Sequence, residues 1–149
     1  MMSVSGFSLD VAKKEGLEIQ IETGELEDTH PNTAEITLTA ADGEKVSLRG
    51  SSIGGGNILI TRVNGMEVAL TGQNPALIVL HKDAPGTIAA VTELMAEYGV
   101  NICNFHLARE TKGGVAVMTI ESDSHFVPEL NEKINRLENI YSSTMLERV

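Results

Sequence analysis

The stretch Ala76-Leu77-Ile78-Val79-Leu80-His81-Lys82-Asp83-Ala84-Pro85-Gly86 decides the fold of the C-terminal half of this chain. Its five consecutive aliphatic residues predict a buried β-strand, because a short apolar run bounded by polar and turn residues is typical of strands. Pro85-Gly86 then predicts the start of a helix. Four apolar side chains of that helix fall on one face and are expected to reach the core: Ile88, Val91, Leu94 and Met95.

The residues after Gly99 continue the alternation of strands and helices. Four further elements are predicted: strands at 100–108, 115–120 and 140–146, and a helix at 126–137. The resulting order, strand–helix–strand–strand–helix–strand, is the βαββαβ order of a ferredoxin-like domain. We place this domain at residues 74–149, after a polar, turn-forming segment at 71–75.

Residues 1–73 have a different pattern, in which short alternating segments are separated by turn residues. Asp42-Gly43 and Asn64-Gly65 are strong signals for tight hairpin turns. This region is therefore predicted to be a β-rich meander domain, and the whole chain an α/β protein of the α+β kind.

The first residues of the chain predict two further elements. A short helix is expected at residues 9–15, where Gly16 ends it. Leu17, Ile19 and Ile21 then alternate with polar residues, which predicts a half-buried strand.

Composition and charge narrow the class of protein. The 149 residues include 11 basic and 21 acidic ones, a net charge of −10, whereas nucleic-acid binding requires basic side chains that neutralise phosphates. No apolar run is long enough for a membrane helix and no secretory signal is visible, so we expect a cytoplasmic protein without a nucleic-acid or membrane partner. The single cysteine, Cys103, excludes an internal disulfide and a cysteine-ligated metal site within one chain. Its apolar context predicts a buried side chain.

The glycine-rich segment from Ser51 to Asn57 has two interpretations. It could hold an anion or a small ligand, because glycine backbone N–H groups and serine hydroxyls donate hydrogen bonds. The residues of such a loop would be Ser51, Ser52, Gly54, Gly55, Gly56 and Asn57, together with the polar residues His30 and Asn32. A phosphate loop, however, leads into a helix, whereas residues 57–60 are predicted to be a strand. A glycine-rich turn between two strands is therefore the alternative.

The clearest candidate site follows the strand at residues 76–80. His81, Asp83 and Gly86 lie where this strand meets the helix, and Asn101 opens the next strand. A free amino acid needs donors for its carboxylate and acceptors for its ammonium group, and a helix start supplies N–H donors. A polar loop that binds no ligand is the alternative, and composition alone favours it. The sequence contains no nucleophile–base pair and no metal-ligand spacing, so we assign no catalytic residue and no metal to this chain.

Three segments of the C-terminal half match the pattern of a known family: residues 77–86, 99–102 and 109–118. On these segments, residues 77–149 resemble the ACT domain family. Domains of this family are regulatory, pair through their sheets or helices, and often bind amino acids at the interface. The resemblance implies a homodimer and a ligand site formed by His81, Asp83, Gly86, Asn101 and Ile102. Serine-binding members often have Asn where this chain has Asp83.

Two motifs of the N-terminal half are more specific: Thr29-His30-Pro31-Asn32-Thr33-Ala34 and Gly50-Ser51-Ser52-Ile53-Gly54-Gly55-Gly56-Asn57-Ile58. With them, residues 16–72 resemble the β chain of bacterial iron–sulfur L-serine dehydratase. In that family an allosteric-substrate-binding-like domain precedes the ACT domain. The family's β chain also carries an N-terminal active-site segment that this sequence lacks, so residues 1–73 are expected to be part of that first domain.

The resemblance implies a function in serine metabolism and gluconeogenesis. L-serine dehydratase (L-serine ammonia-lyase) converts L-serine to pyruvate and ammonia, and its 4Fe–4S cluster belongs to a catalytic α chain. This chain would then be a regulatory part, inactive alone and without a cofactor of its own, that binds L-serine or another small amino acid. Two alternatives stay open: a free-standing ACT module that senses amino acids, and a regulatory fragment of a phosphoglycerate dehydrogenase.

Overall fold

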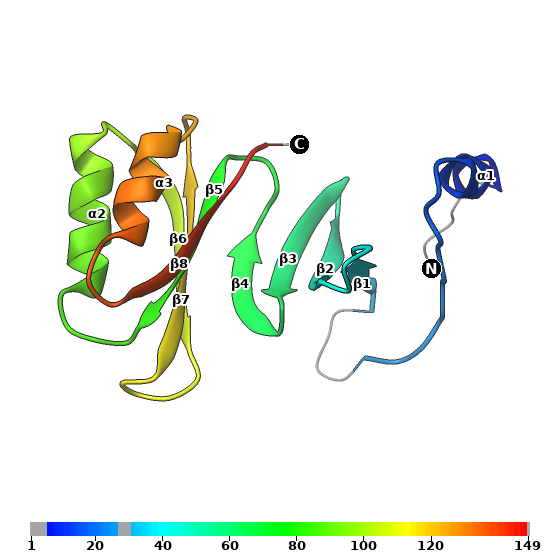
Figure 1. Ribbon diagram of the computed structural model, residues 1–149, viewed down its shortest axis with the longest axis horizontal. Coiled ribbons are helices and arrows are strands. Elements are labelled where there is room, and N and C mark those ends of the chain that lie inside the picture. The colour runs from blue at the N-terminus through cyan, green and yellow to red at the C-terminus, as the bar shows by residue number, and fades with distance from the viewer. Residues whose placement is uncertain (1–5, 27–30, 149) are drawn as a thin grey trace.

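The computed structural model describes residues 6–26 and 31–148, which include two four-stranded antiparallel sheets (Figure 1). After helix α1 (Gly6–Lys14), the first sheet is a meander of β1 (Thr33–Thr39), β2 (Lys45–Gly54), β3 (Asn57–Val63) and β4 (Met66–Leu70), in that spatial order. Gly43, Asn64 and Gly65 have left-handed backbone angles at the predicted hairpin turns. The predicted β-rich meander is confirmed.

The second sheet has the spatial order β6-β7-β5-β8. It is built from β5 (Ala76–Lys82), β6 (Ile102–Arg109), β7 (Val115–Ser122) and β8 (Ile140–Leu146). Helices α2 (Thr87–Glu97) and α3 (Pro128–Asn135) cover one face of this sheet (Figure 1). This is the predicted ferredoxin-like βαββαβ arrangement, and the α+β class is confirmed with it.

The main core lies between the second sheet and its two helices. Its buried side chains are Leu77, Val79, Val91, Met95, Met118, Ile120, Phe126, Leu130 and Ile134. Each such side chain stabilises the fold by about 1.5–3 kcal/mol through burial. The prediction for Ile88 was wrong, because this side chain is 38% exposed. The buried stripe of α2 instead follows the four-residue spacing of Thr87, Val91 and Met95.

A second apolar cluster joins the two sheets. It combines side chains of β4 with side chains on the helix-free face of the second sheet: Val68, Leu70, Ala76, Ile78 and Val117. The predicted boundary segment, residues 71–75, connects β4 to β5 beside this cluster. The two sheets therefore share a packed interface, and the division into domains 1–73 and 74–149 stays a prediction.

A buried carboxylate reinforces the same interface. Glu121 of β7 is 1% exposed. It accepts hydrogen bonds from the backbone N–H of Thr71 at 3.0 Å, from the Thr71 hydroxyl at 2.7 Å and from the Asn104 amide at 2.8 Å. Because Thr71 follows β4 directly, these bonds tie the first sheet to the second.

The strand predicted from Leu17, Ile19 and Ile21 was wrong. These side chains are 55%, 44% and 52% exposed, and their segment has no regular structure. An alternating segment becomes a strand only when a neighbouring strand pairs with it, and none of the strands in the described residues does so.

The prediction of a buried Cys103 was also wrong, because its thiol is exposed. Cys103 lies at a register shift of the β6–β7 pairing, between Ile102 and Asn104, on an edge strand of the sheet. Such a bulge leaves one residue without a partner in the ladder. Partial desolvation, followed by the charges of Asp123 and Glu121, raises the pKa of this thiol. A protonated thiol is a poor nucleophile.

No described helix combines the length and the apolar character that crossing a membrane requires.

Candidate functional site

The connection from β5 to α2 holds Asp83, whose carboxylate forms two hydrogen bonds within the candidate site. The Asp83 carboxylate accepts hydrogen bonds from the Arg109 guanidinium at 2.7 Å and from the Gly113 backbone N–H at 2.9 Å. It therefore ties the end of β5 to the turn between β6 and β7. Gly86 begins α2 with a left-handed φ of 87°, and no side chain caps the helix. Uncapped N–H groups at a helix start bind water or an anionic ligand.

The contacts of Asp83 predict its titration. The hydrogen bond from Gly113, and then that from Arg109, lower the pKa of Asp83 below its ordinary value of 3.8. A depressed carboxyl pKa stabilises the fold above the unfolded value, and this stabilisation is lost as the pH falls through the folded value. In Arg109→Gln the pKa should move back towards 3.8 while the Gly113 bond persists. A ¹³C NMR titration of the Asp83 carboxyl group checks this, and an unchanged pKa would show that Arg109 has no influence.

Two buried polar atoms lie at the same end of the second sheet. His81 is 1% exposed, and its Nδ1 donates to the carbonyl of Lys82 at 2.8 Å. A carbonyl only accepts, so Nδ1 carries the proton and the Nε2 of a neutral ring is an acceptor. Neither His81 Nε2 nor the hydroxyl of Thr87, which is 3% exposed, has a hydrogen-bond partner among the described residues. Buried polar atoms without partners are rare.

Asn101 lies far from Asp83 within one chain. The ladder pairs Ile102 with Ser122 at one end of β6 and Arg109 with Ala116 at the other, and Asp83 contacts Arg109. Asn101 is therefore separated from Asp83 by roughly 20 Å, the length of a strand. Its amide donates to Asp123 at 2.6 Å. Ile102 packs against the main core. The structure thus brings together His81, Asp83 and Gly86, and places Asn101 and Ile102 at the opposite end.

The glycine-rich segment forms the turn between β2 and β3. Gly54, Gly55 and Gly56 have φ angles of 94°, 64° and 78°, which L-residues with side chains rarely adopt. A strand follows, not a helix, which supports the turn interpretation; the anion loop stays a prediction.

The other predicted residues of this loop already form hydrogen bonds within the protein. The Ser51 hydroxyl lies 2.7 Å from that of Thr33, Ser52 N–H donates to the Asn32 carbonyl at 2.9 Å, and Asn57 accepts from Gln73 at 2.7 Å. His30 lies outside the described residues.

Sequence reasoning missed Arg109, Gly113 and Glu121. The hydrogen bonds of Asp83 span 26 and 30 residues, and that from Thr71 to Glu121 spans 50. The sequence offered a signal for Glu121, which is the one charged residue of β7.

The chemistry of the arrangement is that of a binding site. Asp83 can accept from an ammonium group, and the start of α2 can donate to a carboxylate. In the part of the chain that the structure describes, no group of three or more His, Cys, Asp or Glu side chains could hold a metal ion.

Comparison with known proteins gives two levels of similarity. Residues 77–142 match the family model described as "AHAS small subunit-like ACT domain". The chain is 37% identical, over 93% of its length, to "Probable L-serine dehydratase, beta chain" of Bacillus subtilis, and it covers 63% of that protein.

Two further relatives match over a similar range. The L-serine dehydratase β chain of Peptoniphilus asaccharolyticus is 27% identical over 94% of this chain and is covered to 64%. D-3-phosphoglycerate dehydrogenase of Methanocaldococcus jannaschii is 33% identical over 87% of this chain and is covered to 24%. The chain thus spans less than two thirds of each relative. Its residues 77–142 match the ACT domain model, and nearly all of its length is similar to L-serine dehydratase β chains.

Proposed function

We propose that this chain is the regulatory, amino-acid-binding part of an L-serine dehydratase that works with a catalytic α chain in the cytoplasm. The similarity to a β chain over 93% of the chain carries this proposal. An iron–sulfur cluster does not fit the residues of this chain, because such clusters need several cysteine ligands and Cys103 is the single one. The cluster is therefore assigned to the α partner, and this chain would bias the conformation of that partner.

The proposed ligand is L-serine, bound between Asp83 and the start of α2. Asp83 is held in place by Arg109 and Gly113 and would accept from the ammonium group. The uncapped start of α2 would receive the carboxylate. Asn101 is the natural partner for the hydroxyl, since its Nδ2 is fixed by Asp123 and its Oδ1 remains an acceptor.

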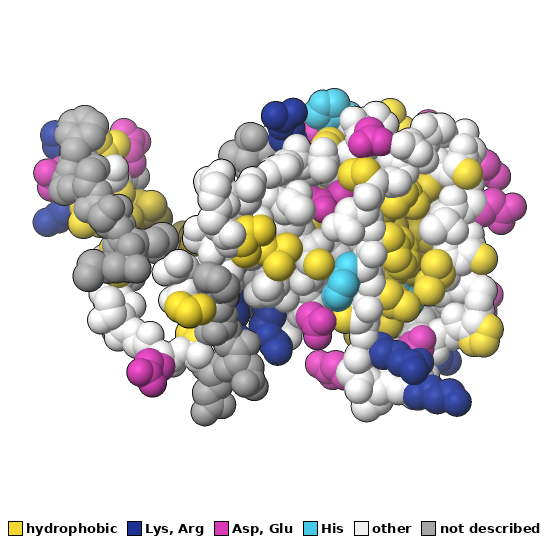
Figure 2. All heavy atoms as spheres, turned by 180° about the vertical axis from the view of Figure 1, so that it is seen from behind, with side chains coloured by type: hydrophobic (Ala, Val, Ile, Leu, Met, Phe, Trp, Pro, Cys, Tyr) yellow, Lys and Arg dark blue, Asp and Glu magenta, His cyan; other side chains and the backbone are white. Residues whose placement is uncertain are grey.

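A homodimer would bring Asn101 to this site. β6 is an edge strand of the second sheet, and two copies can pair their β6 edges antiparallel about a two-fold axis. Such pairing places the Asn101 end of one β6 beside the Arg109 end of the other. Ile88, Phe105 and Leu107, on α2 and β6, are 38%, 37% and 39% exposed. Figure 2 shows hydrophobic side chains gathered in a band on the right of the molecule, where the second sheet and its helices lie. This band supports burial against a second copy.

Calorimetric titration tests the proposed ligand. Serine should bind, and alanine should bind roughly ten- to a hundredfold more weakly, because a polar group left unpaired costs about 1–3 kcal/mol. Asn101→Ala should reduce this preference, whereas Thr39→Ala on the first sheet should leave it unchanged. Equal binding of serine and alanine would reject the site. Light scattering of the same sample should report about twice 16.0 kDa.

A regulatory part of a phosphoglycerate dehydrogenase is the second candidate, favoured by the 33% identity to the M. jannaschii enzyme. Co-expression of this chain with a catalytic partner distinguishes the two candidate functions. Serine-dependent pyruvate formation with an L-serine dehydratase α chain, and none with this chain alone, supports the first candidate. A free-standing sensor module would bind serine and associate with neither enzyme.

A further inference from the structure

The polar face of the first sheet carries two arginines directly opposite each other. Arg49 of β2 and Arg62 of β3 are partners in the antiparallel register, so their side chains leave the same face of the sheet. Like charges in this position destabilise a strand pair unless an anion lies between them. The pair is flanked in the same row by two carboxylates, since Arg49 also pairs with Glu35 of β1 and Arg62 with Glu67 of β4.

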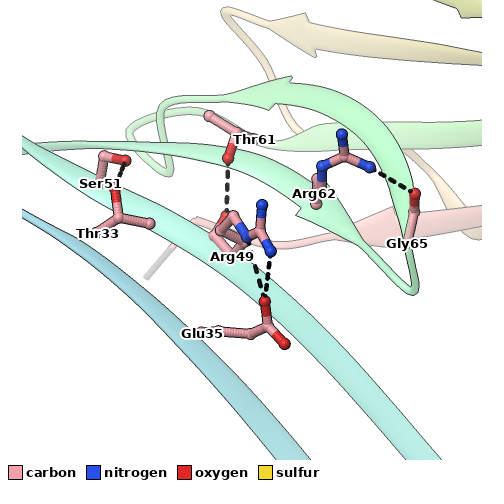
Figure 3. A network of polar contacts seen from close by, with 7 residues as sticks. All are labelled: Thr33, Glu35, Arg49, Ser51, Thr61, Arg62 and Gly65. Carbon is pink, nitrogen blue, oxygen red and sulfur yellow. Dashed lines mark hydrogen bonds and ion pairs between the residues drawn. The ribbon is translucent and has the colours of Figure 1, made fainter. Parts of the chain in front are cut away.

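The two guanidinium groups are only partly engaged (Figure 3). Arg49 donates to one oxygen of Glu35 through Nε at 3.2 Å and Nη2 at 2.7 Å. Arg62 donates through Nη1 to the Gly65 carbonyl at 3.2 Å. A guanidinium group has five N–H donors, and the described residues supply no further acceptor to either group. Glu35 and Gly65 therefore orient the arginines and leave donors for a ligand.

A cavity of about 200 Å³ opens beside them, lined by Glu35, Ser47, Leu48, Arg49, Arg62 and Gly65. Pockets for drug-sized molecules measure about 300–1,000 Å³, so this cavity suits a ligand of a few heavy atoms. The Ser47 hydroxyl adds a donor at its wall.

We propose that this cavity, between Arg49 and Arg62, binds a small monocarboxylate. Glu35 and Glu67 are the register partners of Arg49 and Arg62, so two carboxylates balance the charge of the pair. A phosphate dianion would meet repulsion from both carboxylates, whereas a monocarboxylate brings a single charge and two acceptor oxygens to the free N–H donors of the arginines. A planar carboxylate also matches the fork of a guanidinium group. The site lies on the first sheet and is independent of the amino-acid site at Asp83.

Sodium pyruvate is the probe, titrated at constant ionic strength against sodium chloride and inorganic phosphate. The reporters are the side-chain ¹⁵N–¹H signals of Arg49 and Arg62, so binding elsewhere does not register. Pyruvate should shift both signals and saturate, and chloride should not. Arg62→Lys keeps the positive charge but loses the planar, bidentate geometry of the guanidinium group, and should weaken pyruvate binding roughly tenfold. Arg136→Gln, an exposed charge at the end of α3, is the matched control.

Three results would overturn the proposal. They are shifts that chloride reproduces, phosphate binding more tightly than pyruvate, and unchanged affinity in Arg62→Lys. Backbone amide spectra of Arg62→Lys that match those of the wild type show that the first sheet remains folded.

Discussion

Replacing Glu121 by alanine is expected to lower the free energy of unfolding by about 2–4 kcal/mol. Each hydrogen bond to a charged group contributes about 1.5–3 kcal/mol. The net loss is smaller than the sum of three such bonds, because the substitution also removes the desolvation cost of the buried carboxylate. Glu121→Ala removes three such bonds and leaves the N–H of the half-buried Thr71 without its acceptor, whereas the exposed Asn104 amide can turn to water. The loss is larger than that of a surface carboxylate because Glu121 is 1% exposed.

Urea unfolding monitored by circular dichroism measures this effect. Thr71→Val removes the hydroxyl bond but keeps the backbone bond, so its loss should be intermediate. Glu97→Ala, an exposed carboxylate on α2, should stay within about 0.5 kcal/mol of wild type. A Glu121→Ala variant as stable as the Glu97→Ala control would show that the carboxylate does not hold the two sheets together.

Mixing two variants that each bind serine weakly should restore tight serine binding in part of the sites. If each site combines Asp83 of one copy with Asn101 of the other, Asp83→Ala and Asn101→Ala should each weaken binding in both sites, by about tenfold or more. Random exchange between the two variants makes half of the dimers mixed, and each mixed dimer has one intact site. About one quarter of all sites should therefore bind with wild-type affinity.

Calorimetry after exchange of subunits counts these sites. Thr39→Ala mixed with Asn101→Ala is the control, and it should give about half of the sites as intact. If mixed dimers form and the Asp83→Ala and Asn101→Ala mixture still has no sites of wild-type affinity, the two residues do not share a site across the two-fold axis.

The second sheet was predictable because its signals are local. The apolar run at 76–80, the helix start at Pro85-Gly86 and the stop at Gly99 each depend on neighbouring residues. The failures arose from contacts that the sequence does not display. Leu17, Ile19 and Ile21 alternate as a strand should, but their exposure depends on whether another strand pairs with them.

The candidate site was predictable only in part. His81, Asp83 and Gly86 are close in sequence and therefore close in space. Asn101 follows α2, which returns the chain to the other end of the sheet, so its distance from Asp83 becomes visible only with the topology. The register pair of Arg49 and Arg62 depends on the bulge in β3, which no local pattern indicates.

The exposed aliphatic side chains of residues 17–21 have a practical consequence for handling the protein. β1 is an edge strand of the first sheet, and its side chains Ile36 and Leu38 are 43% and 58% exposed. An alternating apolar segment and an edge strand both favour aggregation through pairing between strands of different chains. Electrostatic repulsion between chains opposes it at neutral pH, where the net charge is −10. That repulsion vanishes near the isoelectric point of about 4.8, so mildly acidic buffers favour precipitation.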